Sequence, residues 1–258
     1  DDIIDFIEKP GIDILDEWKS PLGDEYLNQG KEYLASMGIY IFNRKVLMDL
    51  FDEMPEANDF GKEIIPNSVR SEKYKAISFP FGGYWTDIGS IKSYFEANLT
   101  LTKFLPQFNL FDNHNHVYTS ARMLSPSKVF DTRLKHTLIS DGCIIHAEVI
   151  KNSIVGIRSR IGQRTVIESS IIMGNDYYQA LEDLSEASQT KVLGIGMDCF
   201  IERTIADKNV KIGNNVKIVG HDSLDDHETD LYAIREGIII LKKGVTIPDN
   251  TVIGYTEN

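Results

Sequence analysis

The chain has 258 residues, 42% of them hydrophobic, which is enough to bury one large core or two ordinary ones. The formal net charge is −12, the pI is about 5.0 and no run of lysine and arginine occurs, so we exclude a nucleic-acid-binding protein. A few local cations would still suffice for a small anionic ligand. No apolar run approaches the roughly 20 residues of a membrane span, and the first residues do not resemble a secretory signal.

Residues 1–7 have the composition of a β-strand and include no initiator methionine, so we expect this chain to be the C-terminal part of a longer protein. Glu8, Lys9 and Pro10 follow, at the end of a strand where an open α/β sheet places its ligands. A carboxylate beside an ammonium group suits sugar hydroxyls and a phosphate. The alternative is a solvated loop.

Residues 33–42 and 74–81 are rich in apolar side chains and predict two further strands. Ser36-Met37-Gly38 interrupts the first, which by itself is more typical of a bulge than of a site. Three segments have helical spacing. The first contains Val46, Leu47, Leu50 and Phe51, and the second follows residues 59–62 and is bounded or kinked by Pro66. The third contains Ile91, Tyr94, Phe95, Asn98 and Leu99. We expect Ser90 to cap the last helix, and an α/β domain over residues 1–104.

Residues 84–89, Tyr-Trp-Thr-Asp-Ile-Gly, place one carboxylate between two aromatic residues and a glycine at a junction between strand and helix. Asp87 is therefore a candidate ligand of Mg²⁺. The alternative is a helix N-terminal aspartate stabilised by the helix dipole. Residues 105–128 are rich in Pro, Asn, His and Asp and predict a linker.

Apolar side chains then recur at every sixth position of residues 129–258. The series are Cys143, Val149, Val155, Ile161, Ile167 and Met173; Phe200, Ala206, Ile212 and Ile218; and Leu241, Ile247 and Ile253. One inward side chain per hexad, stacked between rungs, predicts a three-sided coil, whereas the strands of a sandwich would alternate with period two. The polar residues 174–194, which include Asp176, Glu182, Asp183 and Glu186, predict a loop outside the coil.

Only two cysteines occur, Cys143 and Cys199, and the first lies on the inward series. Buried thiols are therefore expected rather than a disulfide or a metal site, in a reduced, cytoplasmic setting.

Several segments occur in the order found in ADP-glucose pyrophosphorylases, also called glucose-1-phosphate adenylyltransferases. They are residues 5–10, 35–40, 58–61, 84–89 and 94–99, and, along the coil, 126–128, 153–159, 173–178 and 194–196. The chain resembles this family over essentially its whole length. The resemblance implies a partial Rossmann-like α/β nucleotidyltransferase domain followed by a left-handed parallel β-helix of hexapeptide repeats.

The resemblance also implies an activity that makes ADP-glucose and pyrophosphate from ATP and glucose 1-phosphate, with Mg²⁺, for glycogen or starch synthesis. The setting would be the cytoplasm, or the plastid in a plant, and the protein a homo- or hetero-oligomer such as a tetramer. By the same resemblance, Glu8 binds sugar hydroxyls, Lys9 the sugar phosphate and Ser36 the glucose. Asp59 lies near the sugar pocket, and Asp87 is one of two aspartates that hold Mg²⁺.

Asp207, Lys208 and Lys243 match positions at which the family binds an anionic allosteric effector, although solvated lysines are the alternative. Arg158, Arg160 and Arg164 form another basic group, suited to an anion or an interface. The family's glycine-rich nucleotide loop, first metal-binding aspartate and adenine pocket do not occur in these residues. We therefore expect the chain alone to be inactive.

Three other functions remain open. A hexapeptide-repeat acyltransferase would need a histidine base at the coil, and the candidates, His136, His146, His221 and His227, lie in no recognisable acyltransferase setting. A non-catalytic regulatory or oligomerisation subunit would use the coil as a scaffold. Another sugar nucleotidyltransferase with the same two domains would differ in its substrate.

Overall fold

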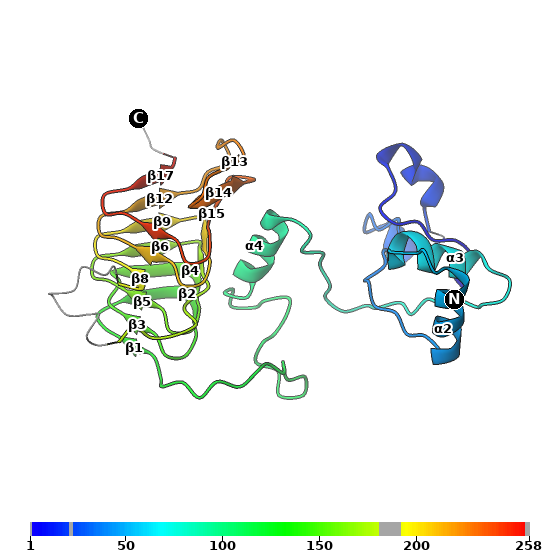
Figure 1. The fold of residues 1–258 in the computed structure, drawn as a ribbon, viewed down its shortest axis with the longest axis horizontal. Coiled ribbons are helices and arrows are strands. Elements are labelled where there is room, and N and C mark those ends of the chain that lie inside the picture. The colour runs from blue at the N-terminus through cyan, green and yellow to red at the C-terminus, as the bar shows by residue number, and fades with distance from the viewer. Residues whose placement is uncertain (1, 21–22, 181–191, 256–258) are drawn as a thin grey trace. The chain divides into compact units, whose positions relative to one another are not determined.

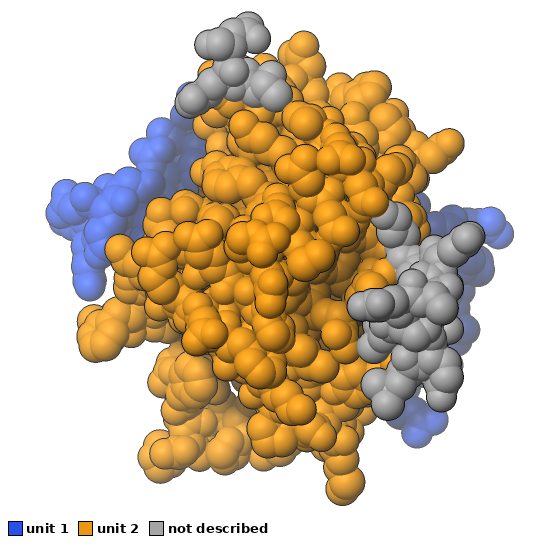
Figure 2. All heavy atoms as spheres, turned by 90° about the vertical axis from the view of Figure 1, so that its left-hand side faces the viewer, with its two compact units in different colours: residues 1–85 blue, residues 86–258 orange. Residues whose placement is uncertain are grey.

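The structure is a computed structural model that describes residues 2–20, 23–180 and 192–255. The chain forms two compact units, Asp1–Trp85 and Thr86–Asn258, which are coloured separately in Figure 2 and described in turn. None of the helices among the described residues has the length and apolar character needed to cross a bilayer.

The first unit consists of short helices joined by extended segments. They are the 3₁₀-helix η1 (Ile12–Trp18), α1 (Asp24–Leu27), α2 (Arg44–Glu53), the π-helix η2 (Phe60–Ile64) and α3 (Ile65–Arg70) (Figure 1). The predicted helical face of α2 is confirmed, because Leu50 is buried and Phe51 packs edge-on against Phe60, with ring centroids 5.9 Å apart. Pro66 lies in the first turn of α3, which continues directly from η2, so the helix is not ended at this proline.

Regular strands were expected in this unit at residues 1–7, 33–42 and 74–81, and for the described residues that expectation is wrong. A single antiparallel bridge joins Asp2 to Ile77, next to a hydrogen bond from the Ile3 N–H to the Ala76 carbonyl. No strand forms within residues 33–42, where Ile41 is 98% exposed. Apolar composition favours an extended backbone, but a strand also needs a neighbour that supplies hydrogen-bond partners.

The second unit is a coil of parallel strands in two sheets (Figure 1). Among the described residues one sheet has six strands, in the order β1 (Lys128–Val129), β3 (Ile144–Ile145), β5 (Arg160–Ile161), β8 (Gly194–Ile195), β11 (Lys211–Ile212) and β16 (Thr246–Ile247). The other has eleven, β2 (Arg133–Ile139), β4 (Val149–Val155), β6 (Val166–Glu168), β7 (Ile171–Ile172), β9 (Phe200–Glu202), β10 (Thr204–Ala206), β12 (Lys217–Val219), β13 (His227–Glu228), β14 (Tyr232–Arg235), β15 (Ile238–Leu241) and β17 (Val252–Gly254).

Strand β4 shows why the larger sheet covers two sides of the coil. Its first half pairs with β6 and its second half with β7, and between them Asn152 has a left-handed backbone with φ of 48°. Asparagine tolerates this conformation better than most residues, so the chain turns a corner within one strand. The six-stranded sheet forms the third side, which gives the predicted three-sided coil.

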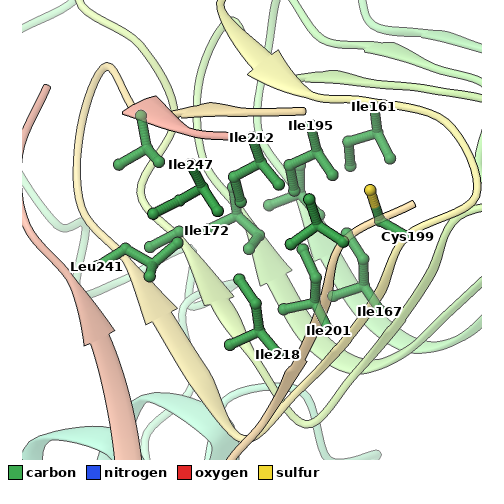
Figure 3. Close-up of a cluster of buried hydrophobic side chains, with 14 of the residues drawn as sticks. Ile161, Ile167, Ile172, Ile195, Cys199, Ile201, Ile212, Ile218, Leu241 and Ile247 are labelled. Atoms are coloured by element: carbon green, nitrogen blue, oxygen red, sulfur yellow. The ribbon is translucent and has the colours of Figure 1, made fainter. Parts of the chain in front are cut away.

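The core of the coil consists of stacked aliphatic side chains (Figure 3). The three inward columns are Ile145, Ile161, Ile195, Ile212 and Ile247; Ile150, Ile167, Ile201, Ile218 and Ile253; and Val155, Ile172, Ala206 and Leu241, each paired in register with its neighbours. Most of the predicted inward positions are confirmed, but Val149, Met173 and Phe200 are wrong by one residue. The corner between the second and third columns is one residue shorter, so the sixfold spacing slips there.

Helix α4 (Ile91–Thr100) covers the outside of this coil. Phe95 is buried with Ile171, Ile205 and Ile238, which point outward from β7, β10 and β15. Met173 packs against the same cluster, which explains its outward position. The predicted cap is confirmed, because the Ser90 Oγ accepts from the Ser93 N–H at 3.1 Å and the Ser93 Oγ from the Ser90 N–H.

Two further segments leave the coil. Strands β13 and β14 form an antiparallel extension of β15, an insertion that the sequence did not predict. The polar loop predicted at 174–194 lies largely outside the described residues, and this applies to Glu182, Asp183 and Glu186. Residues 101–127 contain neither helix nor strand between α4 and β1.

Candidate functional site

Glu8 and the segment 58–61, two of the predicted site segments, meet in the first unit. Glu8 is partly buried, and a β-carbon placed on Gly61 would lie 2.9 Å from the Glu8 Oε2. Glycine at position 61 therefore leaves the space that this carboxylate occupies. Lys9 is exposed and has a left-handed backbone with φ of 49°, which costs free energy for a residue with a side chain.

Asp59 caps the π-helix η2. Its Oδ1 accepts from the Lys62 N–H at 2.8 Å, while the Glu63 Oε2 accepts from the N–H groups of Asn58 at 2.6 Å and Asp59 at 2.9 Å. These bonds satisfy amides that a helix N-terminus leaves free. They fix the turn beside Glu8, and one Asp59 oxygen is already engaged in capping.

Ser36 lies in a bend rather than in a strand. Its Oγ accepts from the Gly38 N–H at 3.2 Å and lies 2.9 Å from the Tyr40 hydroxyl. Gly38 has φ of 70°, which glycine adopts at little cost. No hydrogen bond between described residues joins Ser36 to Glu8 or Asp59, so these contacts do not place Ser36 in the same group.

Asp87 belongs to the second unit and lies on an exposed segment just before α4. Its Oδ1 accepts from the Gly89 N–H at 3.0 Å, and a β-carbon at Gly89 would lie 3.3 Å from its Oδ2. The turn therefore orients the carboxylate and leaves Oδ2 without a hydrogen bond from the described residues. An exposed carboxylate oxygen is the hard donor that Mg²⁺ prefers, and Mg²⁺ is commonly held by one or two carboxylates plus substrate phosphates. Asp87 can therefore supply one oxygen ligand, although no cluster of three or more ligating side chains occurs among the described residues.

The lysines of the predicted effector site meet at Asp176. The Lys208 Nζ lies 2.5 Å from Asp176 Oδ1 and the Lys243 Nζ lies 3.7 Å from Oδ2, which also accepts from Asn209 Nδ2 at 2.9 Å. The hydrogen bond from Lys208, with that from Asn209, lowers the pKa of Asp176 below its usual value. The two lysines do share an anion, but it is a side chain of the same chain.

Asp207 and Asp176, the two carboxylates beside these lysines, have roles other than those predicted. Asp207 accepts the Lys208 N–H through its Oδ1 at 2.6 Å and so orders the backbone next to the lysine. Asp176 was predicted only as part of the polar loop at residues 174–194. Asp176 lies two residues after Gly174, which has φ of 81° and turns the chain after β7. Glycine and asparagine at 174 and 175 are typical turn residues, so the sequence did indicate a turn next to Asp176.

Several of the other predicted basic and imidazole groups have local partners. Arg164 forms two hydrogen bonds with Asp198, at 2.6 and 2.7 Å, and the Arg158 guanidinium lies 5.6 Å from the centre of the Tyr178 ring. Among the candidate histidines, His146 stacks on Phe130 with centroids 4.0 Å apart and His221 stacks on Tyr255 at 4.4 Å. These contacts assign packing roles to the two imidazoles.

Two family models match consecutive parts of the chain. Residues 1–103 match the family model described as nucleotidyl transferase. Residues 122–252, just over half of the chain, match the GLGC left-handed parallel β-helix domain. The chain belongs to this GLGC family of sugar nucleotidyltransferases, and the predicted fold class is confirmed.

Proposed function

We propose that the protein containing these residues is a glucose-1-phosphate adenylyltransferase that makes ADP-glucose and pyrophosphate from ATP and glucose 1-phosphate. The observation that carries the proposal is the contact between Glu8 and Gly61, because it joins two segments of the sugar-binding signature in one unit. A sugar phosphate needs hydroxyl acceptors and a cation close together, which Glu8 and Lys9 provide.

The roles of the individual side chains follow from their chemistry. Glu8 accepts hydrogen bonds from sugar hydroxyls, Lys9 neutralises the sugar phosphate, and Ser36 contacts the glucose. The Asp59 turn holds the wall of the sugar pocket against Glu8. An oxygen of the sugar phosphate attacks the α-phosphorus of ATP and pyrophosphate leaves. Catalysis of this step consists mainly of positioning and charge neutralisation.

Asp87 would hold Mg²⁺, and its Oδ2 is the oxygen that is not engaged with the Gly89 N–H. When bound, Mg²⁺ neutralises charge on the nucleotide phosphates. The contribution of this chain is to orient the carboxylate through the Gly89 N–H. The glycine-rich nucleotide loop does not occur in the 258 residues, so the proposal includes that this chain alone does not catalyse the reaction.

A second part of the proposal concerns regulation. Lys208 and Lys243 bind an anionic effector, next to Asp207. Their shared contact with Asp176 supports this, because the two ammonium groups already converge on one negatively charged group. The effector would replace the Asp176 carboxylate between them.

The test is an assay of pyrophosphate release by the natural protein that contains these residues, with glucose 1-phosphate and ATP. Lys9→Ala removes a charged contact with phosphate, so the KM for glucose 1-phosphate should rise about ten- to a hundred-fold. Lys45→Ala, an exposed lysine on α2, is the matched control and should leave KM unchanged. An unchanged KM in Lys9→Ala would refute the sugar-phosphate site.

A further inference from the structure

The turn that joins the inserted strand β14 to β15 bonds to the helix that follows Asp87. The side-chain Oε2 of Glu236 accepts from the backbone N–H of Lys92 at 3.1 Å. Lys92 lies in the first turn of α4, where backbone amides have no partner within the helix. Glu236 therefore caps α4 from a distant part of the sequence, and its negative charge lies at the positive end of the helix dipole.

The position of Glu236 is itself fixed by the insertion. Glu236 has a left-handed backbone with φ of 52°, and its N–H donates to the Asp226 Oδ1 at 2.9 Å. Its carbonyl accepts from the Arg203 Nη2 at 3.3 Å, and Arg203 also pairs with Asp222. The hydrogen bond from Arg203 lowers the pKa of Asp222, and the charge of Lys92 adds to this shift.

The body of α4 is held on the same face of the coil. Phe95 is 6% exposed and packs on Ile171, Ile205 and Ile238, and the last of these begins β15 directly after the turn at Glu236. The helix thus has two attachments, an apolar one along its length and a polar one at its first turn.

The segment in front of α4 has much less support. Every residue from 81 to 90 is exposed, and Asp87 is linked to the helix through its bond to the Gly89 N–H and the Ser90 cap. Within the described residues of the second unit, the attachments nearest to Asp87 along the chain are therefore Ile91, which packs against the Phe95 cluster, and the contact between Glu236 and Lys92. The direction of the Asp87 carboxylate depends on how firmly the first turn of α4 is held.

We propose that the β13–β14 insertion is a clamp for the first turn of α4, and that Glu236 is a positioning residue for Asp87. The proposal rests on the proposed role of Asp87 as a ligand of Mg²⁺. It assigns a function in the transferase reaction to a part of the β-helix.

The test uses the natural protein and compares Glu236→Ala with Glu236→Gln, which keeps an oxygen acceptor. The control is Glu228→Gln on the same hairpin, because Glu228 pairs with Arg235 and Lys242 rather than with α4. Hydrogen exchange of residues 86–93 measures the clamp, and the dissociation constant of Mn²⁺, from its electron paramagnetic resonance signal, measures the metal site.

In Glu236→Ala the Lys92 amide should exchange about ten-fold faster and Mn²⁺ should bind several-fold more weakly, while Glu236→Gln stays within about two-fold of the wild type. Unchanged exchange and Mn²⁺ affinity in Glu236→Ala, or equal changes in Glu228→Gln, would overturn the proposal. Phe95→Leu loosens the apolar attachment and should change exchange in the same direction.

Asp87→Asn separates the clamp from the proposed function. If this variant binds Mn²⁺ as the wild type does, Asp87 is not a metal ligand, and the positioning role of Glu236 is overturned with it. Faster exchange in Glu236→Ala would then still show the clamp. If Asp87→Asn weakens Mn²⁺ binding and Glu236→Ala does not, only the positioning role is wrong.

Discussion

The carboxylate of Glu8 lies against the α-carbon of Gly61, within 2.9 Å of where a β-carbon would be. Gly61 is the second residue of the π-helix η2. A substitution of Gly61 therefore acts on Glu8 without altering a charged group. Helices of this kind are rare and occur frequently at functional sites.

Gly61→Ala should therefore displace Glu8, whose flexible side chain can move, and raise the KM for glucose 1-phosphate several-fold with little change in stability. The assay is pyrophosphate release by the natural protein, with thermal unfolding measured in parallel. Gly23→Ala, where a β-carbon would meet no atom within 4 Å, should leave KM unchanged. Equal KM values in Gly61→Ala and the wild type would show that Glu8 does not bind the sugar.

Asp176→Asn should strengthen anion binding at the coil. The substitution removes the charge that Lys208 and Lys243 share, so inorganic phosphate should bind about three- to ten-fold more tightly. Isothermal titration with phosphate checks this. Asp198→Asn is the control, because it releases Arg164 at a different corner. Greater or equal tightening in the control would count against a site at the two lysines.

Acid should destabilise the folded chain through its paired carboxylates. The hydrogen bond from Arg164 lowers the pKa of Asp198 below its usual value of 3.8. A carboxyl with a lowered folded-state pKa stabilises the fold above its usual pKa, and this stabilisation is lost as the pH falls through the lower value. The midpoint temperature of thermal unfolding should therefore decrease as the pH is lowered below about 4.

Asp198→Asn should make that decline shallower, and Asp230→Asn, at a residue with no ion pair among those described, should not. Thermal unfolding between about pH 6 and pH 3 measures the slope. Identical slopes in the wild type and Asp198→Asn would contradict the role of the pair.

Phe95→Ala should destabilise the second unit by about 3 kcal/mol, because it removes a buried aromatic side chain from the interface between α4 and the coil. Phe104→Ala, at a side chain that is 89% exposed, should change the free energy of unfolding by less than about 0.5 kcal/mol. Urea unfolding of both variants measures these changes in the free energy of unfolding. Similar losses in the two would mean that α4 is not packed as described.

The coil could be predicted from sequence because its period is repeated many times and each repeat buries one aliphatic side chain. The choice between Val149 and Ile150 could not, because both are aliphatic and only the tighter corner at Asn152 decides which points inward. Met173 was misplaced for a related reason. Its burial comes from α4, which is distant in the sequence.

The first unit was harder to predict. Residues 33–42 have the apolar composition of a strand, but hydrogen-bond partners decide whether a strand forms, and composition does not supply them. In the site, Glu8 was predicted from its place after an expected strand as well as from the resemblance, and Asp59 from the resemblance. The contact of Glu8 with Gly61 and the ion pairs of Asp176 depend on backbone geometry, which these patterns do not give. The clamp at Glu236 joins segments far apart in the chain and has no local signature.

The most direct test of the central claim is the release of pyrophosphate by the natural protein that contains these residues, supplied with each nucleoside triphosphate and a panel of sugar 1-phosphates. Pyrophosphate release is expected with ATP and glucose 1-phosphate in preference to every other pair, and it should be lost in Asp87→Asn. A folded protein that releases no pyrophosphate, or that prefers another sugar phosphate or another nucleotide, would contradict it.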